Sequence, residues 1–180
     1  MRPALAMRLV HQGAILLLCG TAQQLAAQGA PARDGFWFGA DAGYGRLSLP
    51  NCSECEPAGV PVGSMRFGAT LGNHALVGLE LSRTANGAAS GLPALTLAAA
   101  TAYVYPMPRS GFHVKVGIGP ASRGGYSNVD GFATIGFLAG LGFDRRVARN
   151  ISVVPFISWL GILGGYETHV IQGGVGVTFH

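Results

Sequence analysis

The chain has 180 residues, of which 49% are hydrophobic and only 11% are charged, and its formal net charge is +4. Soluble domains usually have about 25% charged residues and about 7% glycine, whereas this chain contains 29 glycines. This composition excludes a disordered tail and disfavours an ordinary charged soluble enzyme. It also excludes a multi-helix membrane protein, because a spanning helix needs about 20 consecutive apolar residues and the chain has no such run.

The first segment has the layout of a secretory signal peptide. Arg2 and Arg8 precede an apolar run, and small residues follow it. We therefore assign residues 1–32 to a signal peptide with a short leader, and residues 33–180 to a single domain. A lipid anchor at Cys19 is disfavoured because a bulky residue precedes it. Loss of Arg2 and Arg8 lowers the formal charge from +4 to +2, so the sequence indicates no nucleic-acid partner.

From Gly35 onward the apolar residues recur at every second position, in runs of about ten separated by Gly, Pro, Asn and Ser. A period of two predicts strands and not helices. The predicted strands are Phe36 to Leu49, Val62 to Gly72, Ala75 to Thr84, Ala94 to Tyr105, Phe112 to Ser122, Phe132 to Phe143, Ile151 to Leu160 and Thr168 to Phe179.

The period alone does not tell the inside of a barrel from the outside. Three features favour an apolar outer face: the polar face is rich in glycine and the chain has a single lysine, the signal peptide sends the chain across the inner membrane, and aromatic residues cluster at the ends of runs. We therefore predict an all-β fold, a closed antiparallel transmembrane β-barrel of about eight strands, in contact with outer-membrane lipid. A soluble lipocalin-like barrel is the alternative.

Two stretches near the end of the chain carry a family resemblance. The first joins Gly142-Phe143-Asp144, Arg149-Asn150-Ile151-Ser152 and Pro155-Phe156, and the second runs from Val170 to Phe179. The first resembles the penultimate hairpin, and the second the final strand, of small outer-membrane proteins of the OmpA-like barrel superfamily. The resemblance implies an outer-membrane location. It also implies that Phe179 is the terminal aromatic read by the outer-membrane barrel assembly machinery, although here His180 follows it.

Cys52 and Cys55 lie in the first predicted outer loop. An exported protein meets an oxidising compartment, so we predict a local disulfide between them, and two free thiols are the alternative. A zinc site is disfavoured because tetrahedral zinc needs four ligands, no second cysteine pair is present, and His74 is expected at the opposite end of the barrel.

Four charged residues fall on the glycine-bearing face of their strands: Asp41, Arg66, Glu80 and Lys115. If the apolar face meets lipid, these side chains form a charge network inside the barrel. A three-residue turn at 73–75 would set Glu80 diagonal to Arg66, close enough to pair. We expect this network to plug the interior, because a barrel of about eight strands has little room beyond its own side chains.

We therefore expect a non-catalytic integral outer-membrane protein with a structural or surface-interaction role and with no cofactor or metal ion. A narrow pore and a lipid A deacylase-like enzyme are the alternatives. The enzyme lacks support, since the histidine two residues before a serine is missing and nothing in the spacing brings Ser127, Glu167 and His169 together. Arg145, Arg146 and Arg149 are interpreted as a solvated turn, with lipid head groups as the second reading. The oligomeric state stays open.

Overall fold

The computed structural model describes residues 35–50, 56–85, 94–124, 134–163 and 167–180. The predicted leader at 1–32 and the cysteine pair Cys52 and Cys55 lie outside these ranges, and so does Ser127. Within the described ranges, no helix has the length and apolar character needed to cross a membrane.

The described residues form nine strands, and their bounds follow the alternating sequence pattern closely. The predicted strands at 75–84 and 168–179 coincide with the observed ones, whereas the second strand begins four residues earlier than predicted. The strands are β1 (Phe36–Ser48), β2 (Ala58–Thr70), β3 (Ala75–Thr84), β4 (Ala94–Val104), β5 (Phe112–Gly124), β6 (Thr134–Phe143), β7 (Arg145–Ala148), β8 (Ile151–Ile162) and β9 (Thr168–Phe179).

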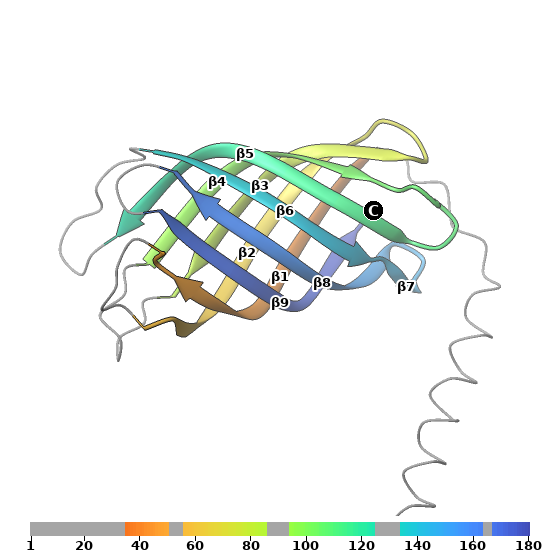
Figure 1. The fold of residues 1–180 in the computed structure, drawn as a ribbon. Helices are drawn as coiled ribbons and strands as arrows, with labels where there is room; N and C mark the ends of the chain where they lie inside the picture. The colour runs from red at the N-terminus through yellow and green to blue at the C-terminus, as the bar shows by residue number, and fades with distance from the viewer. Residues whose placement is uncertain (1–34, 51–55, 86–93, 125–133, 164–166) are drawn as a thin grey trace, which may run out of the picture. The chain divides into compact units, whose positions relative to one another are not determined.

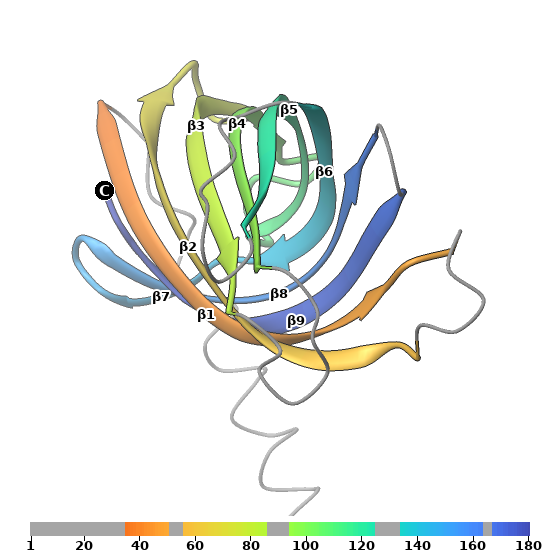
Figure 2. The same cartoon turned by 90° about the vertical axis from the view of Figure 1, so that its left-hand side faces the viewer.

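The strands pair as an antiparallel meander that closes on itself. Each pairs with its neighbour along the chain from β1 to β6, β9 pairs with β1 and β8, and β6 pairs with β8. Eight strands thus form a ring around one interior (Figure 1, Figure 2). This confirms the predicted closed all-β barrel. The ninth strand, β7, is a correction, because the segment predicted as a turn at 144–150 pairs with the start of β8.

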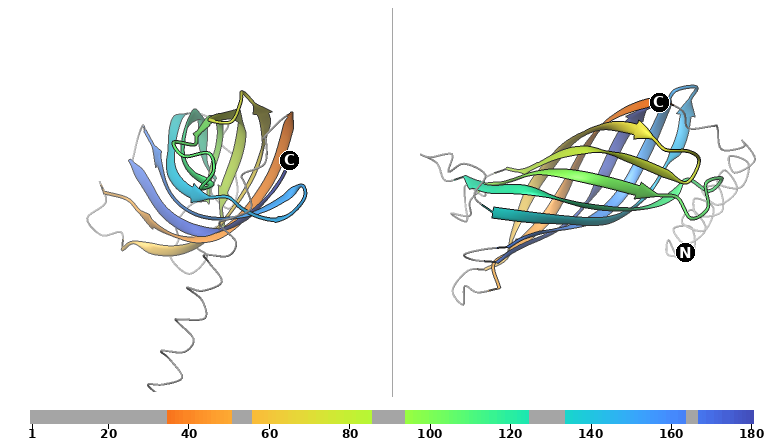
Figure 3. Two further views of the ribbon diagram at one scale, coloured as in Figure 1. Left: turned by 90° about the vertical axis from the view of Figure 1, so that its right-hand side faces the viewer. Right: turned by 90° about the horizontal axis from the view of Figure 1, so that it is seen from above.

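The barrel is strongly staggered. When hydrogen-bonded partners are followed once around the ring, the path leaves β1 at Arg46 and returns to β1 at Phe36, ten residues away. A stagger of this size requires the strands to tilt by about 35 to 45° from the barrel axis. The tilt is visible in Figure 3. At this strand number the interior is just wide enough to be filled by side chains.

We call the two ends of the barrel the turn end and the loop end. The turn end holds the start of β1, the end of β9 and the connections at 71–74, 105–111 and 144–150, and the loop end is the opposite one. Outer-membrane barrels have short turns on the periplasmic side and longer loops outside. In barrels of that kind the loop end corresponds to the extracellular side.

The first turn differs from the predicted one. The amide of Leu71 donates to the carbonyl oxygen of Ala75 at 2.9 Å, so the turn consists of residues 72–74 and not 73–75. Gly72 has a φ of +129°, a conformation that glycine adopts without steric cost. The predicted register is consequently wrong by two residues. A shift of two leaves every side chain on its predicted face.

The outward face of the barrel is a continuous apolar belt. Large apolar side chains such as Met65 (58% exposed) and Ile118 (52%) point away from the interior. At the turn end the belt has a ring of outward phenylalanines, which are Phe36, Phe38, Phe67, Phe143 and Phe179. Exposed apolar surface of this extent marks contact with lipid, and the aromatic ring marks a membrane interface.

Candidate functional site

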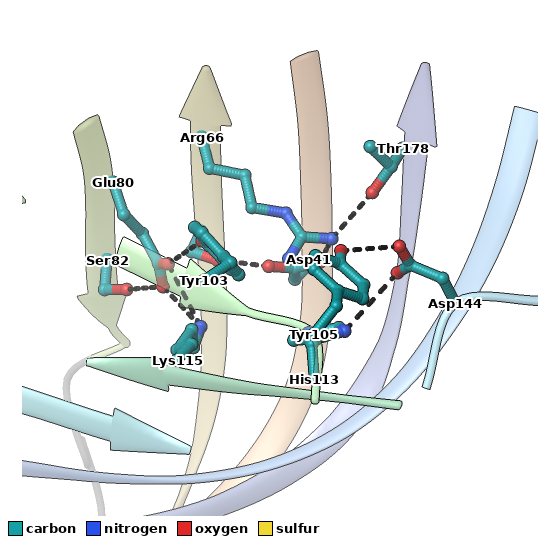
Figure 4. Close-up of polar contacts among 11 residues, drawn as sticks. Asp41, Arg66, Glu80, Ser82, Tyr103, Tyr105, His113, Lys115, Asp144 and Thr178 are labelled. Atoms are coloured by element: carbon teal, nitrogen blue, oxygen red, sulfur yellow. Dashed lines mark hydrogen bonds and ion pairs between the residues drawn. The ribbon is translucent and has the colours of Figure 1, made fainter. Parts of the chain in front are cut away.

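The inside of the barrel contains two layers of different chemistry, and both are built from the inward positions of the same strands. The layer nearer the turn end is polar. Its four charged side chains are the ones predicted from the sequence: Asp41 is 8% exposed, Arg66 4%, Glu80 2% and Lys115 4%. Figure 4 shows them converging from four strands. We call this group the polar layer.

Glu80 and Lys115 form the first ion pair of the polar layer. Lys115 Nζ lies 2.9 Å from Glu80 Oε1 and 3.0 Å from Oε2, so the ammonium group contacts both carboxylate oxygens. The Glu80 carboxylate also accepts hydrogen bonds from Tyr103 Oη at 2.8 Å and from Ser82 Oγ at 3.1 Å. A buried carboxylate is tolerated when its oxygens are bonded in this way.

Asp41 and Arg66 form the second ion pair. Arg66 Nη2 lies 3.0 Å from Asp41 Oδ1 and donates to Thr178 Oγ1 at 2.9 Å. Ser64 Oγ donates to Asp41 Oδ2 at 2.9 Å. The guanidinium carbon of Arg66 lies 5.7 Å from the centre of the Tyr103 ring, and this cation–π contact links the two ion pairs.

The predicted pairing of Glu80 with Arg66 is wrong. The two residues are direct partners in the β2–β3 register, but the ion pair of each is formed with another strand. Lys115 reaches Glu80 from β5, past the strand between them, and Asp41 meets Arg66 from β1. Closed curvature explains the Glu80–Lys115 pair, since it brings the inward side chains of non-adjacent strands together across the narrow interior, whereas Asp41 lies diagonal to Arg66 on the neighbouring strand.

A smaller polar cluster lies at the turn end below these pairs. Tyr105 Oη donates to Asp144 Oδ2 at 2.6 Å, and the ring nitrogen Nδ1 of His113 lies 3.7 Å from Asp144 Oδ1. Trp37 packs edge-on against Tyr103 with ring centres 5.3 Å apart. Sequence reasoning missed this cluster. The available signal was the inward alternation of Tyr103, Tyr105, His113 and Lys115 on two successive strands.

The layer nearer the loop end is apolar, which the sequence-based prediction did not anticipate. We expected the inward face to carry mainly glycine and polar residues throughout. Instead its inward positions bury large aliphatic side chains, and Leu47, Leu97 and Val170 are fully buried. This group, which we call the apolar layer, consists of Leu47, Val60, Val62, Leu95, Leu97, Ala99, Ala121, Leu138, Leu160, Ile162 and Val170.

Glycines give the polar layer its room. A Cβ atom at Gly176 would collide with the Asp41 carboxylate, and one at Gly39 would lie 2.7 Å from Arg66 Nε. Both positions point inward, so the absent side chains are replaced by the charged groups of the neighbouring strands. The Gly-rich inward pattern is therefore a packing feature here.

The remaining predicted residues are placed as follows. Phe179 faces outward and is 45% exposed, in register with Phe38 at the closure of the barrel. The structure does not describe Cys52 and Cys55, so the disulfide stays a prediction. In the described part of the chain, no three His, Cys, Asp or Glu side chains are grouped in a way that suits a metal ion.

Comparison with known proteins supports the fold. Neisserial surface protein A matches with a TM-score of 0.65 and 19% sequence identity over 83% of this chain and 98% of that one. The attachment invasion locus protein Ail of Yersinia pestis matches with a TM-score of 0.51 and 14% identity over 81% of this chain and 99% of that one. No protein-family model and no curated protein sequence matches.

Proposed function

We propose that the chain is a small outer-membrane β-barrel of the OmpA-like type, which its barrel fold and its apolar outward belt support. We propose that it is a non-catalytic membrane-spanning protein with a closed interior, and that it has a structural or surface-interaction role. The observation that carries this proposal is the succession of two filled layers along the interior. An ion entering from either end meets both the polar and the apolar layer.

The two layers oppose conduction in different ways. The polar layer holds two acids and two bases whose charges are matched in pairs, so it offers a passing ion little unpaired charge. The apolar layer presents mainly aliphatic side chains to an ion, with the buried hydroxyl groups of Thr84 and Thr168 among them, and hydrophobic constrictions exclude water from pores by dewetting. A narrow pore, the main alternative, requires both layers to open together.

Planar-bilayer recording of the mature protein tests this proposal. Folded barrel is first verified by heat-modifiable migration on gels, since a closed sheet has no free edge and persists in detergent until it is heated. We expect no steady single-channel current. A Leu79→Ala variant, altered only on the lipid-facing side, serves as the control and should be equally silent. Large steady currents from the intact protein would overturn the closed interior and favour the pore.

The enzyme alternative is tested separately. We expect lipid A from a strain that overproduces the protein to keep its full set of acyl chains. Loss of one acyl chain in that strain, and its restoration when the gene is deleted, would establish catalysis and end the non-catalytic proposal.

A further inference from the structure

Two arginines face outward near the loop end of the barrel, on the side that meets lipid. Arg46 on β1 lies between the buried Gly45 and Leu47, and Arg83 on β3 likewise lies between two buried residues, whereas both arginines are exposed. A lipid-facing arginine is strongly destabilising at the bilayer midplane and nearly neutral near the interface. Their level in the membrane therefore decides what they contact.

The stagger of the barrel gives that level. Arg46 is ten residues along β1 from Phe36, which belongs to the phenylalanine ring of the turn end. Ten residues span roughly 33 Å along the strand and roughly 25 Å along the axis of a barrel tilted by about 40°. The apolar band of such barrels is about 25 Å tall. Arg46 thus lies at the outer edge of the band, at the level of the outer-leaflet head groups.

Arg83 lies at nearly the same level. Its register partner is Gly63 on β2, and Gly63 in turn pairs with Ala42 on β1, four residues nearer the turn end than Arg46. Because the barrel is staggered, register partners lie progressively nearer the loop end in the direction from β1 to β2 and β3. Two strand steps therefore bring Arg83 most of the way back to the level of Arg46 along the barrel axis.

On β2 the surface between the two arginines is a shelf of glycine and proline, and the Tyr44 side chain of β1 covers the part of it at Gly59. The outward positions of β2 there are Gly59, Pro61 and Gly63, with Gly59 in register with Arg46 and Gly63 with Arg83. Four residues along the strand and two strand spacings set the two Cα atoms roughly 16 Å apart. The Tyr44 ring lies over Gly59, at a depth where tyrosine commonly anchors to head groups.

Neither arginine forms an ion pair with a carboxylate in the part of the chain that the structure describes. In the described ranges, the carboxylates that form ion pairs are Asp41, Glu80 and Asp144, and all of them point inward or lie at the turn end. A guanidinium group binds a phosphate through two parallel hydrogen bonds, and such charge-assisted bonds are about twice as strong as neutral ones.

We propose that Arg46, Arg83 and the shelf of β2 between them bind a bisphosphorylated glycolipid of the outer leaflet, lipid A. Each arginine takes one phosphate group, and the sugar backbone that joins the phosphates lies across Pro61 and Gly63, beside the Tyr44 ring that covers Gly59. The acyl chains then run down the apolar belt below the shelf. A lipid with two phosphates can meet both arginines at once, whereas a lipid with one phosphate can meet only one of them.

Binding of purified lipid A to the folded mature protein in phosphatidylcholine nanodiscs tests the site. We expect an Arg46→Gln/Arg83→Gln variant to bind lipid A at least about tenfold more weakly, because two charge-assisted contacts are lost. The matched control, Arg109→Gln/Arg149→Gln, removes two exposed arginines from the turn end and should bind as the intact protein does. Heat-modifiable migration verifies that each variant is folded.

Two further ligands identify what is recognised. Lipid A with its phosphates removed should bind weakly and equally to all three proteins, and phosphatidylglycerol should lose no more than about twofold in the Arg46/Arg83 variant. Equal losses in both variants, unchanged lipid A binding in the Arg46/Arg83 variant, or an equal loss for phosphatidylglycerol would each overturn the site. Conductance has no part in these measurements, so the site and the closed interior can fail independently.

Discussion

The polar and apolar layers occupy the same inward face of the same strands, but different physics holds them together. In the polar layer, Glu80 and Lys115 must meet at hydrogen-bonding distance, because either charge alone would be stranded in a low-dielectric interior. In the apolar layer, Leu97 and Leu160 need only fill space against their neighbours. The first layer is stabilised by matching of partners and the second by volume.

This difference predicts which substitutions destabilise the barrel most. In the polar layer, the barrel loses most stability when one partner of an ion pair is removed. It loses little stability when both partners are replaced together by apolar groups. In the apolar layer, the loss of stability grows with the volume of the cavity that a truncated side chain leaves. Substitutions in the two layers should therefore follow different rules, and three of them test this directly.

The largest effect is expected for Glu80→Ala. The change leaves the Lys115 ammonium group buried without its carboxylate, and breaking a buried pair in this way typically costs about 3 to 5 kcal/mol. Urea unfolding in detergent, followed by loss of the heat-modifiable band, measures it. The double variant Glu80→Leu/Lys115→Met should recover most of the loss. A Glu80→Ala protein with an unchanged midpoint would show that the pair does not stabilise the barrel.

A somewhat smaller effect is expected for Leu97→Ala in the apolar layer. Leu97 is fully buried, and removing its side chain leaves a cavity whose cost is about 3 kcal/mol. Leu79→Ala on the lipid-facing side, where Leu79 is 51% exposed, is the matched control, because lipid chains fill the space. The same unfolding measurement compares them. Equal losses in the two variants would contradict a packed apolar layer.

The smallest of the three effects is expected for Gly176→Ala. The added methyl group collides with the Asp41 carboxylate and pushes it from Arg66, and overpacking of this kind costs about 1 to 3 kcal/mol. At Gly173, which faces lipid, the nearest atom to an added Cβ lies 3.6 Å away, an ordinary contact. Gly173→Ala should therefore leave the midpoint unchanged, and a similar loss at both glycines would remove the special role of Gly176.

Much of the barrel wall was predictable because local chemistry determines it. Strict alternation placed β3 and β9 at their observed bounds, and it assigned Asp41, Arg66 and Lys115 to the inward face. That assignment survived a register error of two residues, since side chains on a strand repeat with a period of two. The bounds of a strand and the face on which each side chain lies depend on residues close together in the chain, so both can be predicted from the sequence alone.

The pairing of the charged side chains, and the inward placement of the apolar layer, depend on the tertiary structure. Lys115 and Glu80 belong to strands that are not neighbours, and only closure of the ring brings them within 2.9 Å. Near the loop end the inward Leu47 and Leu97 are as apolar as the outward face, so alternation carries no sign of which face meets lipid. Curvature and stagger assign such residues to the interior, and both arise from the closed set of strand pairings, which no single run of the sequence contains.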